Sequence, residues 1–292
     1  MDKHYKYLVS SKRDEDWGIT VNTVGCQIVE KNYQTYPPHT GHPKQFFFSP
    51  VKGRRLESYQ LLYIVQGGGS IFVSSGKSLE IKEGDMIIIR PGMWHSYMPD
   101  KKTGWKEYWI GFEGANMDSR FKNNFFSNDK FIYRIGVQDS IVSLYERAIN
   151  VANEEKAACQ QYLAGIANLI LGMTTYYDQN RCFDTATEEL IDKAKVIIRN
   201  SLVKNITPEE VAERINMSYS WFRKQFKEYT GVSPAHYIQD LKIQEAKHML
   251  VNTNESIKSI SFCLGFEDIA YFNRVFKKYS GITPNEYRKS YS

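Results

Sequence analysis

Two stretches near the C-terminus carry side chains whose types and spacing suit the reading of DNA bases. Residues 221–234 (WFRKQFKEYTGVSP) recur 50 residues later as residues 271–284 (YFNRVFKKYSGITP). Arg can form a bidentate contact with guanine and Asn one with adenine in the major groove, whereas Lys more often contacts phosphate. The repeat therefore predicts that one chain contacts double-stranded DNA through two copies of the same unit.

Helical spacing divides each copy into an apolar face and a polar face. Phe222, Phe226 and Tyr229 share one face of the first copy, and Phe272, Phe276 and Tyr279 are their equivalents in the second. The opposite faces hold the residues that we expect to contact DNA: Ser220, Arg223, Lys224, Lys227, Ala270, Asn273, Arg274 and Lys277. One exposed cation is usually only a solvated residue, but the same division in two copies favours DNA contact, with Arg223 and Arg274 as the strongest base readers.

A shorter predicted helix precedes each copy, and this pattern is typical of a helix-turn-helix. Thr207, Pro208 and Glu210 predict a helix start with a capping box. Asn216 suits the tight turn that follows, and Ser218 suits the cap of the next helix. A further helix starting at Pro234 is expected to pack on both modules, so that one chain reads two adjacent grooves.

The N-terminal part has a different pattern. Apolar runs at residues 61–65, 70–73, 86–89 and 108–112 predict strands, and Gly67-Gly68-Gly69 predicts a turn between the first two. Closely spaced strands with glycine turns are typical of a small sandwich or barrel.

From about residue 138 the apolar period becomes helical. Two amphipathic helices are expected up to residue 178, the second with a stripe formed by Leu163, Ile166 and Ile170. That stripe suits either the chain's own β domain or a second copy of the chain. The polar residues 179–187 predict a linker.

The net charge of +5 resides in the C-terminal part. Residues 190–292 have 16 Lys and Arg against 11 Asp and Glu, while residues 1–189 have 22 of each. A local basic excess suits phosphate binding. The four cysteines form no close pair, the N-terminus has no apolar signal core, and no apolar stretch reaches the ~20 residues that span a bilayer. A cytoplasmic protein with no membrane partner and no cofactor is expected.

The second copy and its flanks resemble the signature of the AraC/XylS transcription regulators. The segments that carry the resemblance are 260–268 (ISFCLGFED), 271–278 (YFNRVFKK) and 281–288 (GITPNEYR), with Ser261 where the family often has Ala. The resemblance implies two helix-turn-helix units that insert into successive major grooves and control transcription. RNA polymerase stays open as a further partner.

The N-terminal half resembles the cupin-like sensor domain of the arabinose-responsive branch of that family. The matching segments are 83–85 (EGD), 90–97 (RPGMWHSY) and 105–112 (WKEYWIGF). The resemblance implies a sugar inside the barrel, held at the matching positions Gln66, Tyr97, Glu107 and Trp109. Gln66 and Glu107 stand where Arg and His are expected, which argues against arabinose itself. An indole face together with amide, carboxylate and phenol groups nevertheless suits a polyol.

Three alternatives stay open at this stage. The aromatic residues could simply fill the barrel. His39, His42 and His95 could hold a metal with a carboxylate, which would make the barrel a metalloenzyme acting on a sugar, although the strand pattern of enzymatic cupins, His-x-His, is missing. The barrel could also serve dimerisation alone.

The expected fold class is α+β, with a cupin-like β-barrel and an all-α double helix-turn-helix domain. We expect a ligand-sensing domain at 1–137, a helical dimerisation segment at 138–178, a linker at 179–187 and the DNA-binding domain at 188–292. The expected function is that of a homodimeric, non-enzymatic transcription regulator of carbohydrate-utilisation genes, which responds to a small-molecule effector, a sugar. An activator is favoured, and the sign of regulation stays open.

Overall fold

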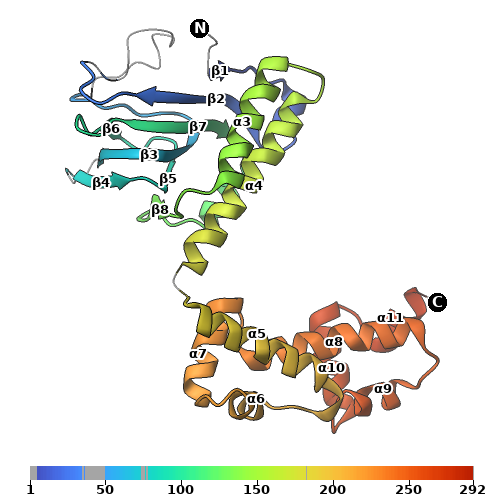
Figure 1. Cartoon of the computed structure of the whole chain (residues 1–292). Coiled ribbons are helices and arrows are strands. Elements are labelled where there is room, and N and C mark those ends of the chain that lie inside the picture. The colour runs from blue at the N-terminus through green and yellow to red at the C-terminus, as the bar shows by residue number, and fades with distance from the viewer. Residues whose placement is uncertain are drawn as a thin grey trace. The chain divides into compact units, whose positions relative to one another are not determined.

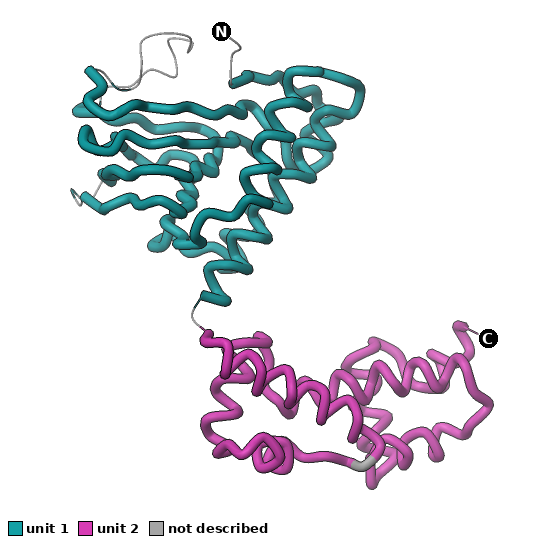
Figure 2. The backbone as a smooth tube through the Cα atoms, in the orientation of Figure 1, with its two compact units in different colours: residues 1–181 teal, residues 182–292 magenta. Residues whose placement is uncertain are grey.

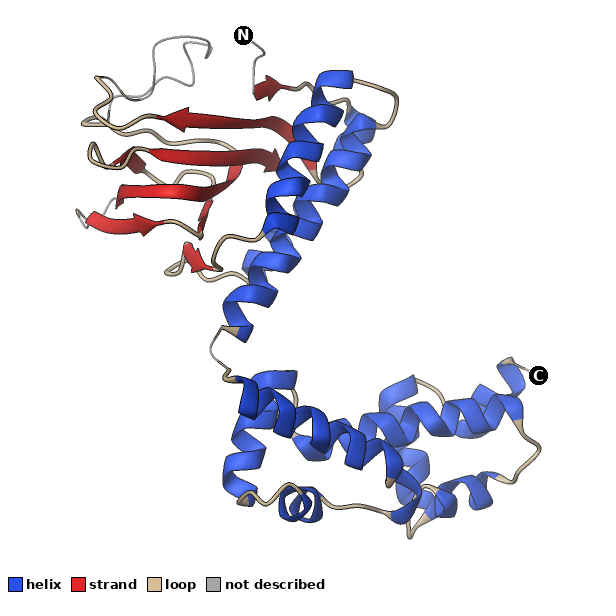
Figure 3. Cartoon of the chain, viewed as in Figure 1, coloured by secondary structure: helices blue, strands red, loops and turns tan. Residues whose placement is uncertain are grey.

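A computed structural model describes residues 5–34, 36, 50–73, 76, 78–181 and 183–291. The chain divides into two compact units, residues 1–181 and 182–292 (Figure 2). Among the described residues, all strands belong to the first unit, and the second unit is built of helices (Figure 3). The α+β class expected from the sequence is confirmed.

The first unit combines antiparallel strands with two long helices (Figure 1). Its elements are β1 (Tyr5–Tyr7), α1 (Lys12–Glu15), β2 (Thr20–Val29), β3 (Tyr59–Val73), β4 (Ser78–Lys82), β5 (Asp85–Ile89), β6 (His95–Pro99), β7 (Trp105–Glu113), α2 (Ala115–Lys122), β8 (Ile132–Arg134), α3 (Asp139–Glu154) and α4 (Cys159–Asn180). The strands follow the order β1-β2-β7-β3-β5-β8, and β4 and β6 also pair with β3.

Strand β3 joins the two parts of the sheet. Its first half pairs with β5 and β7, and its second half, from Gly68 onward, pairs with β4 and β6. The expected turn at Gly67-Gly68-Gly69 is therefore wrong, because strand β3 continues through these glycines, with Gly67 in the left-handed region at φ of 76°. These glycines allow close approach instead: a Cβ on Gly69 would lie 2.1 Å from the Met98 carbonyl oxygen.

Alternate residues of the strands face two apolar layers. Leu62 and Ile64 of β3 belong to an inner layer with Trp105 of β7. Leu61 and Tyr63 face the opposite side, where α3 and α4 cover the sheet. The buried side chain of Gln160 fastens α4 to β2, since it accepts from the Val21 amide (2.9 Å) and donates to the Val21 carbonyl (3.0 Å).

The helical stripe Leu163, Ile166 and Ile170 lies in this outer layer. All three side chains are buried against the sheet and α3 of their own unit. Of the two partners that the sequence left open, the chain's own β domain is therefore the one they contact. Helix α4 ends at Asn180 and the next helix begins at Thr185, so the segment between them is shorter than the expected linker.

The second unit consists of short helices around one longer helix. Its elements are α5 (Thr185–Asn200), the 3-10 turn η2 (Leu202–Lys204), α6 (Pro208–Arg214), α7 (Tyr219–Thr230), α8 (Pro234–Asn252), α9 (Ile257–Cys263), α10 (Ile269–Ser280) and α11 (Pro284–Ser290). The capping box of Thr207 and Glu210 is confirmed, and Asn216 has the expected left-handed backbone, with φ of 58°. A second capping box joins Thr283 and Glu286.

Helix α8 is shared by two separate apolar cores. Ile238 of α8 packs in the first core with Phe222 and Phe226 of α7, and Ile243 of α8 packs in the second with residues of α10. Each pair α6–α7 and α9–α10 thus forms a helix-turn-helix module with its own core. This arrangement confirms the expected all-α domain with two such modules.

Candidate DNA-binding surface and ligand pocket

The second helix of each module begins and ends at well-defined caps. Ser218 Oγ accepts from the Trp221 amide at 3.3 Å at the start of α7, and the Asp268 carboxylate accepts from the Ala270 and Tyr271 amides at the start of α10. Both helices end at a glycine in the left-handed region, Gly231 and Gly281. The two helices are therefore built alike and present equivalent faces.

The residues expected to contact DNA lie on the open faces of these helices. Phe222, Phe226, Phe272 and Phe276 are fully buried on the opposite faces. Seven of the eight expected residues are exposed, and Asn273 is half-buried. The structure thus brings together four of them on α7 (Ser220, Arg223, Lys224, Lys227) and four on α10 (Ala270, Asn273, Arg274, Lys277).

Most of the cations on these faces are available to an external anion. Lys224 Nζ lies 4.0 Å from Glu228, and the Arg274 guanidinium lies 6.0 Å from the centre of the Tyr271 ring. Arg223, Lys227 and Lys277 form no ion pair with any described residue. An exposed pair contributes little free energy, so a phosphate or a base edge can replace it at low cost.

In the first unit a polar cluster lies inside the inner apolar layer. Tyr36 donates a hydrogen bond from its hydroxyl to Glu107 Oε1 at 3.3 Å, and both side chains are buried. The Tyr36 ring lies 6.1 Å from the Tyr97 ring and 5.7 Å from the Trp105 ring, measured between centroids. Two of the expected ligand residues, Tyr97 and Glu107, therefore lie in one cluster.

Arg54 extends this cluster, together with His95. The guanidinium donates from Nη2 to the Tyr97 hydroxyl at 2.7 Å and from Nε to His95 Nε2 at 3.2 Å. His95 Nδ1 lies 2.9 Å from the Met93 carbonyl oxygen, which fixes the neutral tautomer with the proton on Nδ1. The sequence analysis missed Arg54, Tyr36 and Trp105 as site residues. His95 and Tyr97 share one strand face by their two-residue spacing, but no spacing signals Arg54, which reaches them from a loop.

Burial governs the protonation of the cluster. Desolvation raises the pKa of Glu107 to about 8, although the Tyr36 hydrogen bond and the Arg54 charge oppose the rise. Desolvation and the nearby Arg54 charge lower the pKa of His95 to about 4. Burial also raises the pKa of Tyr97 to about 12. At neutral pH the Arg54 guanidinium is therefore the main charge of this cluster.

Two polar atoms of the cluster are buried without a hydrogen bond. They are Glu107 Oε2 and Trp105 Nε1, and neither completes a hydrogen bond of normal geometry within the part of the chain that the structure describes, although Trp105 lies close enough to Glu107 to lower its pKa slightly. A buried polar atom without a partner costs about 1–3 kcal/mol, so such atoms call for an explanation. Glu107 is protonated at neutral pH and its Oε1 accepts from Tyr36, so the proton is on Oε2. A ligand that supplies acceptors would satisfy both atoms.

The other two expected ligand residues lie apart from this pair of atoms. Trp109 follows Glu107 on the same face of β7, but its Nε1 donates to Thr23 Oγ1 at 3.2 Å and its ring stacks on Tyr5. Gln66 is exposed and pairs with Lys106 in the sheet register, on the face turned away from Glu107. The structure thus joins Tyr97 and Glu107, places Trp109 beside them and leaves Gln66 outside.

No group of three His, Cys, Asp or Glu side chains within the described ranges could hold a metal ion. Of the three histidines considered above, His95 is engaged by Arg54, whereas His39 and His42 lie outside the described residues. None of the described helices is long and apolar enough to cross a membrane.

Both units match known protein families. Residues 35–163 match the family described as AraC-like ligand binding domain, and residues 211–290 match the family described as helix-turn-helix domain. The chain belongs to the AraC family of transcription regulators. As in that family, a ligand-binding domain precedes a helix-turn-helix DNA-binding domain, and the expected function of a ligand-responsive transcription regulator is confirmed at this level.

Curated relatives of this AraC-family chain match it over most of their length. The lactose operon transcription activator of Staphylococcus xylosus is 27% identical, with 80% of this chain and 84% of the relative covered. The raffinose operon transcriptional regulatory protein RafR of Pediococcus pentosaceus is 25% identical, with 80% and 86% covered. Among solved structures, the C-terminal domain of the response regulator yesN from Fusobacterium nucleatum is 31% identical, with 36% of this chain and 99% of that chain covered and a TM-score of 0.33.

Proposed function

We propose that this AraC-family chain is a cytoplasmic activator of carbohydrate-utilisation genes and that a neutral sugar bound in the first unit controls it. The names of the lactose and raffinose operon regulators support carbohydrate genes as its targets. The observation that carries the effector proposal is the buried pair of atoms that complete no hydrogen bond of normal geometry in the fold, Glu107 Oε2 and Trp105 Nε1. A sugar hydroxyl oxygen accepts hydrogen bonds, so one hydroxyl or two neighbouring ones can satisfy both atoms.

The surroundings of this pair fit the rest of a sugar. The rings of Tyr36, Tyr97 and Trp105 offer apolar faces to sugar C–H groups. Arg54 already donates to Tyr97 and His95, so its charge is partly engaged. A neutral sugar needs no charged group to be taken out of water into this buried layer, which favours it over a sugar acid.

For the second unit we propose that both recognition helices contact DNA through the eight residues named above. Arg223 and Arg274 would read base edges, with Lys224 and Asn273 next to them, and Lys227 would contact phosphate. Their exposure on the faces opposite the buried phenylalanines supports this assignment. Control by a sugar then requires that the sugar bind with different affinity to two arrangements of the protein.

We also propose that the regulator is a homodimer whose two subunits contact each other through the exposed face of α4. Tyr162, Leu169 and Tyr176 recur every seven residues and are 47%, 52% and 63% exposed. Gly165 and Gly172 lie between them, and a Cβ at either glycine would touch nothing within 4 Å. A mid-helix glycine costs about 1 kcal/mol, and nothing in the described chain accounts for these two. A second copy of α4, packed closely along this heptad face, accounts for both glycines and for the exposed apolar residues.

The proposal gives this chain no catalytic role. It includes a contact with RNA polymerase, which an activator needs. The metalloenzyme alternative has no supporting ligand set among the described residues.

A thermal-shift screen of the full-length chain tests the proposed effector. The screen compares neutral mono- and oligosaccharides with sugar acids, and divalent metals form a parallel set. We expect stabilisation by one class of neutral sugar, and footprints on DNA that change when that sugar is added. Stabilisation by sugar acids alone or by metals alone would contradict the neutral-sugar proposal.

A further inference from the structure

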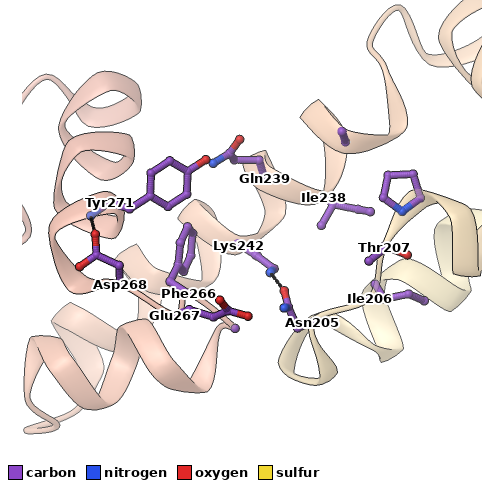
Figure 4. A pocket seen from close by; sticks show the side chains of 13 residues that line it. Asn205, Ile206, Thr207, Ile238, Gln239, Lys242, Phe266, Glu267, Asp268 and Tyr271 are labelled. Carbon is purple, nitrogen blue, oxygen red and sulfur yellow. Dashed lines mark hydrogen bonds between the residues drawn. The ribbon is translucent and has the colours of Figure 1, made fainter.

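Lys242 is a buried cation in the middle of helix α8. Only 7% of this residue is exposed, and Nζ donates a hydrogen bond to Asn205 Oδ1 at 2.7 Å (Figure 4). Nζ also lies 5.3 Å from the centre of the Phe266 ring. It forms no ion pair with a carboxylate of any described residue, and burial lowers its pKa. A buried charge with a single hydrogen bond is costly, so its position calls for a reason.

The partner of Lys242 connects the two helix-turn-helix modules. Asn205 follows η2 and leads into α6 of the first module, with a left-handed backbone at φ of 51°. Its side chain lies against Gly265 in the turn of the second module, where an added Cβ would come within 2.6 Å of Asn205 Cβ. Lys242 therefore holds Asn205 in the space that Gly265 leaves open.

Apart from helix α8, which both modules share, few contacts among the described residues of this region join one module to the other. The modules have separate apolar cores, and Lys242 follows the first core's Leu241 and precedes the second core's Ile243 on α8. A pocket of about 440 Å³ separates them, with Thr207 of the first module and Tyr271 of the second on its walls (Figure 4). A further contact, between the Tyr279 hydroxyl and His236 Nδ1 at 3.2 Å, is exposed to solvent and hence weaker.

We propose that the contact of Lys242, Asn205 and Gly265 fixes the rotation and separation of the two modules of one chain. It would thereby determine which spacing the regulator accepts between the two DNA half-sites, that is, between the two major-groove sites that these modules contact. One inserted base pair moves a half-site by about 3.4 Å and turns it by about 35° around the DNA axis. A rigid joint cannot follow this displacement, whereas a loose joint can. Lys242 acts as a positioning residue, because it touches neither base nor phosphate itself.

The test needs a DNA duplex that the protein binds specifically. This duplex is selected from a randomised library with the full-length wild-type protein. Footprinting locates the two half-sites of the selected duplex, and the dissociation constant is then measured for that duplex and for one with a single base pair inserted between them. For the wild type we expect the insertion to weaken binding about tenfold or more, since the second module loses its contacts.

Two variants remove the contact in different ways. Lys242→Met replaces the cation by an apolar chain of similar length, and Asn205→Gly removes the accepting amide at a position with left-handed backbone. For both we expect weaker binding to the selected duplex and a penalty for the inserted base pair of about threefold or less, because the loosened joint tolerates both spacings. A purely structural role would change the melting temperature without changing this ratio.

Lys247→Met is the matched control. It removes the same charge from the same helix, but Lys247 lies over the Tyr287 ring within the second module. It should keep the wild-type insertion penalty. The proposal is overturned if Asn205→Gly, or a folded Lys242→Met, also keeps that penalty, or if the wild-type chain protects a single half-site only.

Discussion

The Tyr36 hydroxyl donates to Glu107 Oε1 at 3.3 Å inside the β domain, and this contact does not prevent burial from raising the pKa of Glu107 to about 8. In the unfolded chain a glutamate titrates near 4.3, so the folded state retains a proton that the unfolded state has lost. The stability that Glu107 contributes is therefore complete below about pH 4 and is lost as the pH rises to 8.

His95 shifts stability in the opposite direction over a lower pH range. Its pKa falls from 6.5 to about 4 in the folded protein, so its contribution is complete above pH 6.5 and is lost as the pH falls toward 4. Between pH 6.5 and 8 the Glu107 effect is left unopposed by His95. We expect the melting temperature of the wild type to fall across this interval and that of Glu107→Gln to fall much less. Equal slopes for the two proteins would show that Glu107 is ionised in the fold.

Arg223→Ala and Arg274→Ala should each weaken specific DNA binding by about 1–3 kcal/mol, because each removes a bidentate contact with a base. Each variant should also relax the sequence preference at its own base pair. Lys227→Ala should weaken binding to all sequences alike and lower the dependence of the dissociation constant on salt. Titration of selected and scrambled duplexes at several salt concentrations measures all three. Normal binding by both arginine variants would show that the wrong helix face has been assigned to DNA.

Gly69→Ala should destabilise the first unit by about 1–3 kcal/mol, because its Cβ would lie 2.1 Å from a backbone oxygen of β6, which cannot move aside without disturbing the strand pairing. Chemical denaturation of the full chain measures the loss. Gly92→Ala is the control: its backbone φ is +73°, but the new Cβ has nothing within 4 Å, so only a backbone cost of about 1–2 kcal/mol applies. Gly69→Ala without any loss would mean that β3 and β6 are not paired at this point.

Gly165→Ala should have opposite effects on folding and on association. Alanine should stabilise helix α4 by about 1 kcal/mol, since the added methyl group meets nothing in the monomer. The same methyl group should weaken the dimer if two α4 helices approach closely at this point. Sedimentation velocity over a range of concentrations measures the association. Asn150→Ala on the exposed side of α3 is the control and should stabilise its helix without changing association. Unchanged association of Gly165→Ala would remove the glycine face as the interface.

Local patterns in the sequence were sufficient for the helices, caps and turns of the two helix-turn-helix modules. The capping box at Thr207 and Glu210, the turn at Asn216 and the two faces of each recognition helix depend on neighbours within four residues, so helical periodicity reveals them. The joint of Lys242 with Asn205 connects residues 37 positions apart, and no periodicity relates them.

In the first unit the four predicted strand runs lie within β3, β5 and β7, but the other strands and the pairing could not be predicted. The sequence Gly67-Gly68-Gly69 predicts a turn. Only the pairing with β4 and β6 shows that these glycines instead allow the backbones of neighbouring strands to approach β3 closely. The stripe of Leu163, Ile166 and Ile170 likewise has the same pattern whether it meets a sheet or a second helix.

The sequence by itself thus determined the family, the two kinds of domain and the exposed faces of the second helix in each module, because those features are encoded by residue types at short, regular spacing. The tertiary structure decided the composition of the polar cluster and the joint between the modules. Arg54 meets His95 and Tyr97 across more than 40 positions of the chain, and burial there determines the protonation of Glu107. Such contacts depend on how strands and helices pack in three dimensions, which no local pattern records.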